Sequence, residues 1–420
     1  MEYGCIGEHL KHSFSAEIHR ELADYRYEIQ EIEPDRLKDF MTARDFRGIN
    51  VTIPYKEKVI PYLYEIDEMA KEIGAVNTIV NRDGKLYGYN TDFYGMKTLI
   101  LHLGLELCGK KVAILGTGGT SRTARAVAKS LGAASVLVVG RQAREGVIDY
   151  DCLYREHADV EIVINTTPCG MYPYPDGNET VSATAINVSA FQSLCGVVDA
   201  VYNPLRPQLV LDAKQRGVAA EGGLLMLVAQ AVRACEIFLG TSFPQNTCER
   251  IWNRIRQEKE NIVLIGMPAC GKSTVGKLLA GSLGRELYDM DAMIEEKEGK
   301  RISEIFANEG ETYFRDLESD LIKQELAQKN RLVISTGGGA ILRESNLNAL
   351  RRNGRIYFID RPLCALFPTQ DRPLASSADA IRARYEERYD RYCTAADCRV
   401  DAKGNAASVA DAIRKDFEQV

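Results

Sequence analysis

Residues 261–276 read NIVLIGMPACGKSTVG: an apolar run, a loop bounded by glycines, and Lys-Ser-Thr at the start of a helical pattern. Every required position of the G-x-x-x-x-G-K-[ST] pattern is filled, by Gly266, Gly271, Lys272 and Ser273. The glycines let backbone N–H groups turn inward around phosphate oxygens, and the N-terminus of the following helix favours negative charge. The stretch therefore predicts a nucleotide-phosphate loop at the start of a domain of parallel strands and helices.

A second glycine-rich loop lies far upstream, in KVAILGTGGTSRTA at residues 111–124. It also follows a strand pattern and precedes a helical one, which suits a dinucleotide pyrophosphate. The strict G-x-G-x-x-G form fails because Ser121 stands at the third glycine's place. We expect the contacts to come from Gly116, Thr117, Gly118 and Gly119. The next strand pattern ends in Arg141 and not in an acid, which favours the 2′-phosphate of NADP.

Composition narrows the class of protein. The chain has 420 residues, a formal net charge of −6 and a pI of about 5.6. This acidic balance argues against binding to nucleic acid or a membrane surface, and no apolar run approaches the ~20 residues that span a bilayer. The N-terminus lacks the apolar core of a secretory signal, and the eleven cysteines lack CxxC pairs. We expect a cytoplasmic protein with a small soluble substrate, and the sequence leaves its oligomeric state open.

Short apolar runs alternate with amphipathic stretches along the whole chain, which predicts α/β architecture with parallel sheets covered on both faces. A long helical pattern over Leu224–Leu239 would return to the first lobe. The pattern restarts after a polar, helix-like run that contains no flexible linker. We therefore expect a substrate-binding lobe at 1–100, a Rossmann lobe at 101–242, a helical spacer at 243–260, and a P-loop domain at 261–420.

Polar motifs follow the phosphate loop in a fixed order. Strand alternation would put Asp289 and Asp291 on one side, where one carboxylate could hold metal-bound water and the other could accept a hydroxyl proton. Next come FRDLE at 314–318, TGGG at 336–339 and EERYDRY at 386–392. Three glycines directly after a strand let backbone approach a polar ligand closely. With the phosphate loop, this series closely resembles shikimate kinase over residues 261–420.

The resemblance to shikimate kinase implies an α/β/α fold like that of nucleoside monophosphate kinases, and the cofactors ATP and Mg²⁺. It implies that Asp291 is the base and that Ser273 and Asp289 support the metal. Arg315 and Arg388 would clamp the substrate carboxylate. The remaining implied contacts are Gly337, Gly338 and Gly339 on the ring, and Gly266, Gly271, Lys272, Thr274 and Arg372 on ATP. The Arg-Thr pair that the family carries in the lid is missing from the stretch at 367–370.

Polar residues also mark strand ends in the first hundred residues. Lys56 follows a strand pattern in NVTIPYK, and Asp92 ends YNTD, so the two could form a charge-coupled pair. Ser13 and Ser15 flank a helix start, where either could bind a ligand or only cap the helix. These motifs, with GAVNT, GTGG, INTTPCGM, VYNP and EGGLLMLVAQ in order, resemble shikimate dehydrogenase from Met1 to about Leu239.

The resemblance to shikimate dehydrogenase implies that Lys56 and Asp92 are the catalytic pair and that NADP is the cofactor. The implied substrate contacts are Ser13, Ser15, Thr52, Asn77, Tyr202 and Gln230. Thr166 and Gly223, with Tyr202, would line the nicotinamide side of the cleft. Where the family commonly has Asn-Arg-Thr, this chain has Gly-Arg-Gln at 140–142, so two partners of the 2′-phosphate are lost.

Together the two resemblances predict consecutive steps of one pathway: reduction of 3-dehydroshikimate to shikimate, then phosphorylation of the shikimate 3-hydroxyl. Two other interpretations stay open at this point. The C-terminal half could be a nucleotide-sensing module that regulates the dehydrogenase. The N-terminal half could instead act on quinate with NAD.

Overall fold

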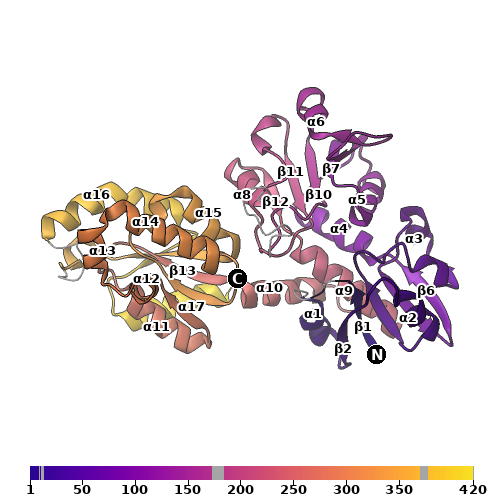
Figure 1. The fold of residues 1–420 in the computed structure, drawn as a ribbon, viewed down its shortest axis with the longest axis horizontal. Helices are drawn as coiled ribbons and strands as arrows, with labels where there is room; N and C mark the ends of the chain where they lie inside the picture. Colours follow the sequence, from indigo (N-terminus) through magenta and orange to yellow (C-terminus); the bar gives the residue numbers. More distant parts are fainter. Residues whose placement is uncertain (9, 11–13, 173–183, 369–376, 420) are drawn as a thin grey trace. The chain divides into compact units, whose positions relative to one another are not determined.

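The computed structural model describes residues 1–8, 10, 14–172, 184–368 and 377–419. The chain divides into two compact units, Met1–Ile255 and Arg256–Val420 (Figure 1). Helix α10 (Thr247–Lys259) crosses the division, inside the segment expected to separate the two parts. The finer domain limits stay a prediction, and Ser13 and Arg372 lie outside the described residues.

The first unit begins with a six-stranded sheet in the order β2-β1-β3-β5-β6-β4. Its strands are β1 (Tyr3–Gly7), β2 (Tyr27–Glu31), β3 (Gly48–Val51), β4 (Glu65–Ile66), β5 (Thr78–Arg82) and β6 (Lys85–Tyr89). Its helices are α1 (Ser15–Leu22), α2 (Leu37–Ala43), α3 (Glu68–Ile73) and α4 (Thr91–His102).

This first sheet is mixed, whereas the alternation of strands and helices had predicted a parallel one. β5 runs antiparallel to both β3 and β6. The reason is local: Asp83 and Gly84 join β5 to β6 with φ of 52° and 81°. Positive φ at both central residues makes the tight turn that an antiparallel hairpin requires. Asp-Gly between two strand patterns was therefore a readable signal for this hairpin.

The second sheet is wholly parallel, in the order β12-β11-β10-β7-β8-β9. Its strands are β7 (Lys111–Leu115), β8 (Ser135–Gly140), β9 (Ile148–Asp149), β10 (Ile162–Asn165), β11 (Gly196–Asp199) and β12 (Ala219–Glu221). The helices are α5 (Gly119–Ser130), α6 (Tyr150–Glu156), α8 (Gln208–Gln215) and α9 (Leu224–Leu239). Because all strand ends point the same way, the loops after β7, β10 and β11 meet at one edge.

Helix α9 joins the two lobes of the first unit. It is apolar on almost every side, as expected for a helix buried all round. Along most of its length it packs against α4, in one hydrophobic cluster with α1 and β7. Near its end Phe238 packs against Tyr3 of the first sheet. This packing brings α4, which begins at Thr91, alongside Gln230 of α9.

The second unit is a five-stranded parallel sheet in the order β14-β15-β13-β16-β17. Its strands are β13 (Asn261–Ile265), β14 (Glu286–Asp289), β15 (Leu332–Ser335), β16 (Gly354–Asp360) and β17 (Cys398–Asp401). Helices cover both faces (Figure 1): α11 (Lys272–Leu283), α12 (Met290–Glu298), α13 (Ile302–Asn308), α14 (Gly310–Leu321), α15 (Glu344–Asn353), α16 (Ala378–Ala395) and α17 (Ala406–Glu418). The predicted α/β class with a parallel P-loop sheet is confirmed.

Among the described residues, no helix is long and apolar enough to cross a membrane.

One buried imidazole makes the first unit sensitive to acid. His19 is fully buried, stacks on the Tyr27 ring at 3.9 Å between centroids, and lies 2.6 Å from the Tyr25 hydroxyl. Burial lowers the pKa of His19 to about 3, so the folded state holds the neutral form below the ordinary value of 6.5. Since the unfolded chain gains this proton first, stability falls as pH drops from about 6.5 toward 3.

We predict that His19→Phe weakens this acid sensitivity, which for one group reaches at most about 1.4 kcal/mol per pH unit. Trp252, the single tryptophan, lies buried in the first unit, so its fluorescence during denaturant unfolding of the full chain gives the measurement. Equal losses of unfolding free energy between pH 7 and pH 5 in wild type and variant would contradict the prediction.

Two candidate active sites

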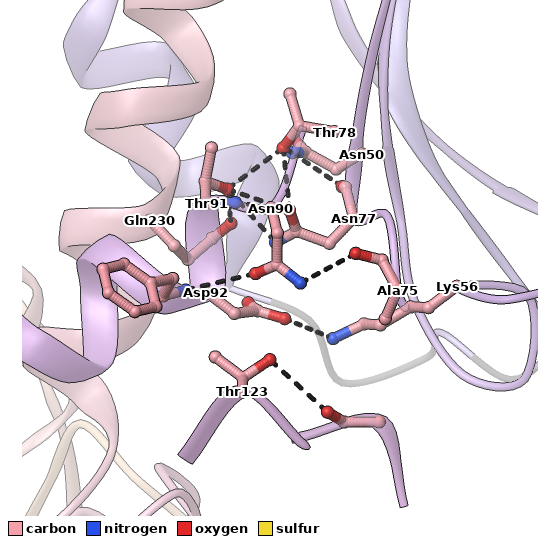
Figure 2. Close-up of polar contacts among 12 residues, drawn as sticks. Asn50, Lys56, Ala75, Asn77, Thr78, Asn90, Thr91, Asp92, Thr123 and Gln230 are labelled. Carbon is pink, nitrogen blue, oxygen red and sulfur yellow. Dashed lines mark hydrogen bonds and ion pairs between the residues drawn. The ribbon is translucent and has the colours of Figure 1, made fainter. Parts of the chain in front are cut away.

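Lys56 and Asp92 form the ion pair that the sequence predicted. Lys56 follows β3, and Asp92 lies in the first turn of α4. The Lys56 Nζ lies 2.5 Å from Asp92 Oδ2, and the two side chains are only 15% and 11% exposed (Figure 2). A pair so little exposed is weakly screened by solvent, and each charge fixes the position of the other. The pair can therefore present an ammonium proton at a defined place.

A hydrogen-bonded network of buried side chains lies on one side of this pair (Figure 2). Asn77 accepts from the Thr91 backbone N–H at 2.7 Å and donates to the Thr91 hydroxyl at 3.1 Å. That hydroxyl lies 3.0 Å from the Thr78 hydroxyl and 3.4 Å from Gln230 Oε1. Asn50 donates to Thr78 at 3.1 Å. The predicted substrate residues Asn77 and Gln230 are thus brought together through Thr91, and Thr78 extends the network to Asn50.

The structure also describes Ser15, Tyr202 and Thr52, three other predicted substrate residues. Ser15 is buried at the first position of α1, and the N-cap is Phe14, so Ser15 does not cap the helix. The Phe14 ring packs edge-on against Tyr202, 5.2 Å between centroids. Burial raises the pKa of Tyr202 to about 12, so its hydroxyl keeps its proton at neutral pH. Thr52 is half-buried directly after β3.

The dinucleotide loop lies between β7 and α5. Gly116 has φ of +108°, where a side chain is strained, and an added Cβ would stand 2.7 Å from the Thr166 hydroxyl. Gly118, the N-cap of α5, has open space around it. A Cβ on Gly119 would meet only Lys56 Cδ, at 3.9 Å. Thr117 is exposed. The free helix N-terminus and the space beside Gly118 and Gly119 fit a pyrophosphate next to Lys56.

Two further predicted cofactor residues follow β8 and β12 of the same sheet. Arg141 follows β8 and is exposed, which leaves its guanidinium available to a phosphate. Gly223 is the N-cap of α9, and its N–H donates to Val201 O at 2.8 Å. A Cβ on Gly223 would overlap the Ala200 backbone, so the close approach requires glycine.

The phosphate loop of the second unit is an inward-turning backbone. Gly266, Ala269 and Gly271 have φ of +147°, +65° and +101°. Such left-handed residues turn successive N–H groups toward one point and form an anion nest. Lys272 is buried, and its Nζ donates to Gly266 O at 2.8 Å and Met267 O at 3.0 Å. A bound nucleotide phosphate would take over this ammonium from those two carbonyls.

Ser273 and Thr274 occupy the first turn of α11, half-buried and exposed respectively. A hydroxyl here and a carboxylate at the end of β14 are hard oxygen ligands of the kind that Mg²⁺ prefers.

The expected alternation of Asp289 and Asp291 along one strand is wrong. β14 ends at Asp289, which caps α12 by accepting from the Ala292 N–H at 3.4 Å. Asp291 lies in the first turn of that helix, where the helix dipole stabilises a negative charge. The two carboxylates still belong to one strand–helix junction. Asp291 Oδ1 would lie 3.2 Å from a Cβ placed on Gly337.

Arg315 and the triple glycine are packed against each other. Arg315 is 9% exposed, and its guanidinium donates to Glu318 Oε2 at 2.5 Å and to Glu311 Oε1 at 2.9 Å. A Cβ on Gly339 would overlap that guanidinium, and one on Gly337 would overlap Glu318. Only glycine permits this approach.

Arg388 completes the polar end of the second site. It is buried in α16, one turn before Tyr392, whose hydroxyl donates to Gly338 O. Two buried guanidinium groups, Arg315 and Arg388, act on the Glu318 pKa. Buried guanidinium groups suit a carboxylate ligand, because they offer paired donors in a fixed geometry.

Sequence reasoning missed several polar residues that the structure brings into these sites. Thr78, Thr91 and Asn50 connect the predicted substrate residues of the first site, and the YNTD motif contains Thr91. Glu318 is fully buried, and burial raises its pKa to about 7, while Arg315 lowers it. Its spacing of three residues from Arg315 on a helical pattern was a signal for this contact.

Comparison with known proteins supports both family resemblances, one for each half of the chain. Residues 5–79 match the family model for the shikimate dehydrogenase substrate binding domain, and residues 268–418 match the shikimate kinase model. A shikimate dehydrogenase (NADP(+)) from Clostridium perfringens is 35% identical over 272 residues, covering 60% of this chain and 98% of the relative.

Solved structures give the same result for the first unit. Shikimate dehydrogenase 1 from Peptoclostridium difficile is 33% identical, with a TM-score of 0.55, over 61% of this chain and 98% of that one. Shikimate 5-dehydrogenase from Thermus thermophilus, solved with NADP(H) and shikimate, is 25% identical with a TM-score of 0.53, over 60% and 99%. The chain therefore belongs to the shikimate dehydrogenase family and carries a shikimate kinase domain at its C-terminus.

Proposed function

We propose that this chain catalyses two consecutive reactions in the cytoplasm: reduction of 3-dehydroshikimate to shikimate with NADPH, and phosphorylation of the shikimate 3-hydroxyl with Mg-ATP. The observation that carries the first reaction is the enclosed Lys56–Asp92 pair beside the dinucleotide loop. The second reaction is supported by the phosphate loop and by the buried Arg315 next to the triple glycine.

In the first site, this chain's own residues bind the ring and move one proton. Ser13, Ser15, Thr52, Asn77 and Gln230 would hold the substrate. NADPH, when bound, supplies the hydride to the C3 carbonyl carbon. The C3 oxygen then needs a proton, and the Lys56 ammonium provides both that proton and a nearby positive charge. Asp92 holds the Lys56 ammonium in position through their ion pair.

The cofactor preference follows from the loop after β8. Arg141 would contact the 2′-phosphate, and the loop Gly116–Gly119 would hold the pyrophosphate. Thr166 and Gly223, with Tyr202, would border the nicotinamide. The NADP(+) named for the Clostridium perfringens relative supports this choice.

In the second site, ATP would supply the phosphoryl group, and Mg²⁺ the positive charge that neutralises the phosphate oxygens. Asp291 would accept the proton of the C3 hydroxyl as that oxygen attacks. Arg315 and Arg388 would clamp the shikimate carboxylate, with Gly337–Gly339 against the ring. Ser273 and Asp289 would support the metal. Lys272 and the backbone N–H groups of the loop would hold the phosphates.

Two other functions predict different results. A nucleotide-sensing module would bind ATP without forming a phosphate ester. A quinate dehydrogenase would use NAD and oxidise its substrate. The buried guanidinium at Arg315, placed where an acidic ligand can be held, favours a module that binds shikimate as well as nucleotide.

We predict that the two activities can be removed separately. Lys56→Ala should lower the rate of 3-dehydroshikimate reduction by about 100-fold or more, because the general acid is lost, and leave the kinase rate unchanged. Lys272→Ala should do the reverse by a similar factor. Lys58→Ala and Lys277→Ala, at exposed positions of the same two segments, serve as controls. A folded single variant that lost both activities would overturn this assignment.

The close packing at Gly339 gives a second test. Gly339→Ala should push the Arg315 guanidinium aside, because a Cβ there overlaps it, and raise the KM for shikimate in the kinase reaction about tenfold. The reduction rate should not change. Gly281→Ala, on α11 with nothing within 4 Å of the added Cβ, is the matched control. An unchanged KM in Gly339→Ala would remove Arg315 from the carboxylate site.

A further inference from the structure

The ends of β10 and β11 are joined by a buried amide–carboxyl pair. Asn165 and Asp199 are partners in register, and both are fully buried. Asp199 Oδ1 accepts from Asn165 Nδ2 at 2.9 Å and from the Val201 backbone N–H at 2.9 Å. Within the described residues its second oxygen has no hydrogen-bond partner. A buried carboxyl that receives two hydrogen bonds fixes the chain segments that donate them.

This pair lies in the middle of a longer chain of hydrogen bonds. Asn165 Oδ1 accepts from the Thr167 N–H at 3.0 Å and from its hydroxyl at 2.7 Å. On the other side, Val201 O accepts from the Gly223 N–H at 2.8 Å. Three segments, after β10, after β11 and at the start of α9, are therefore held to one another through Asp199.

These three segments carry the residues assigned to the nicotinamide side of the cleft. Thr166 lies between Asn165 and Thr167, and Tyr202 follows Val201. Gly223 is itself the last donor of the chain. Each of these residues is therefore either part of the hydrogen-bond network or one peptide unit away from it. Asp199 acts on the cleft only through these residues.

We propose that Asp199 is a positioning residue for the reduction, which fixes the three backbone segments that border the nicotinamide through its bonds to Asn165 and Val201. The inference rests on the proposed function, because it takes the NADPH-dependent reduction as the reaction served. Misplacement of a bound reactant by about 1 Å can cost about 100-fold in rate, so such a scaffold acts on catalysis without touching the reacting atoms.

The pKa of Asp199 depends on burial and on the two hydrogen bonds that its carboxyl accepts. Burial raises the pKa of Asp199 to about 7, and the hydrogen bonds from Val201 and Asn165 lower it. No charged or titratable side chain of the described residues contributes to the shift. Because the folded pKa lies above the ordinary value of 3.8, the stability that Asp199 contributes is full below about pH 4 and is lost as pH rises through 7.

The first experiment compares Asp199→Ala with Asn187→Ala in the full chain. Asn187, an exposed residue of the same lobe, also accepts a backbone N–H two residues ahead, that of Ser189 at 3.0 Å. We expect Asp199→Ala to raise the Kd for NADPH, measured by NADPH fluorescence, and to lower kcat for reduction, each by about tenfold or more. Asn187→Ala should change neither, and the kinase rate should be unchanged in both.

A second set of variants covers the case in which Asp199→Ala does not fold. Asn165→Asp would place two carboxyls in contact and should weaken NADPH binding increasingly as pH rises, because both cannot ionise at that distance. Asp199→Asn alone keeps both hydrogen bonds at Oδ1, because its amide nitrogen takes the place of the oxygen that has no hydrogen-bond partner among the described residues. Because these bonds are kept, Asp199→Asn should stay within about threefold of wild type in Kd and kcat.

The outcomes separate the inference from the function on which it rests. If the wild type reduces 3-dehydroshikimate while Asp199→Ala keeps its Kd for NADPH and its kcat, or if Asp199→Asn is as poor as Asn165→Asp, the positioning role is wrong. If the wild type fails to reduce 3-dehydroshikimate, the proposed function is wrong, and the NADPH titration still decides whether Asp199 shapes the cofactor site.

Discussion

The contact between Lys56 and Asp92 is the constraint on which the first half of the molecule depends. The two residues are 36 positions apart, and their side chains are mostly enclosed. An enclosed ammonium is costly without a partner, so the fold must bring the carboxylate to it. It does so by starting α4 at the end of β6, with Asn90 as the N-cap and α9 packed alongside. The lysine proton is then presented beside the dinucleotide loop.

The second half also buries a cation, and there glycine residues leave the space that the cation needs. Arg315 is buried against the segment Gly337–Gly339, where a side chain at Gly339 would collide with it and one at Gly337 with Glu318. Glu318 and Glu311 form ion pairs with this guanidinium, and these pairs offset the cost of burying its charge when no acidic ligand is bound. The two halves therefore use the same physical device. Each holds a cation in a nearly closed site by means of helix carboxylates: Asp92 of α4 for Lys56, and Glu311 and Glu318 of its own helix for Arg315.

Much of this arrangement was predictable because the patterns are local. The helical pattern over Leu224–Leu239 coincides with α9 at both ends, and both glycine loops follow strands as expected. The antiparallel hairpin at Asp83-Gly84 was missed because the apolar alternation alone does not give strand direction. Asp291 was misplaced because a helix cap at Asp289 overrides strand alternation. Asp199 was overlooked because its importance comes from burial and from partners in other elements, which sequence spacing does not reveal. The spacing of Glu318 from Arg315 did signal their contact, but it does not reveal that Glu318 is buried.

The central claim is that one chain makes an alcohol in its first site and esterifies that same alcohol in its second. Incubation of the intact protein with 3-dehydroshikimate, Mg-ATP and NADPH deuterated at the transferred position tests this directly, with the product analysed by mass spectrometry and NMR. The account predicts a ring that carries deuterium and phosphate on the same carbon. Deuterated shikimate without phosphate, or phosphate on a different carbon from the deuterium, would contradict it.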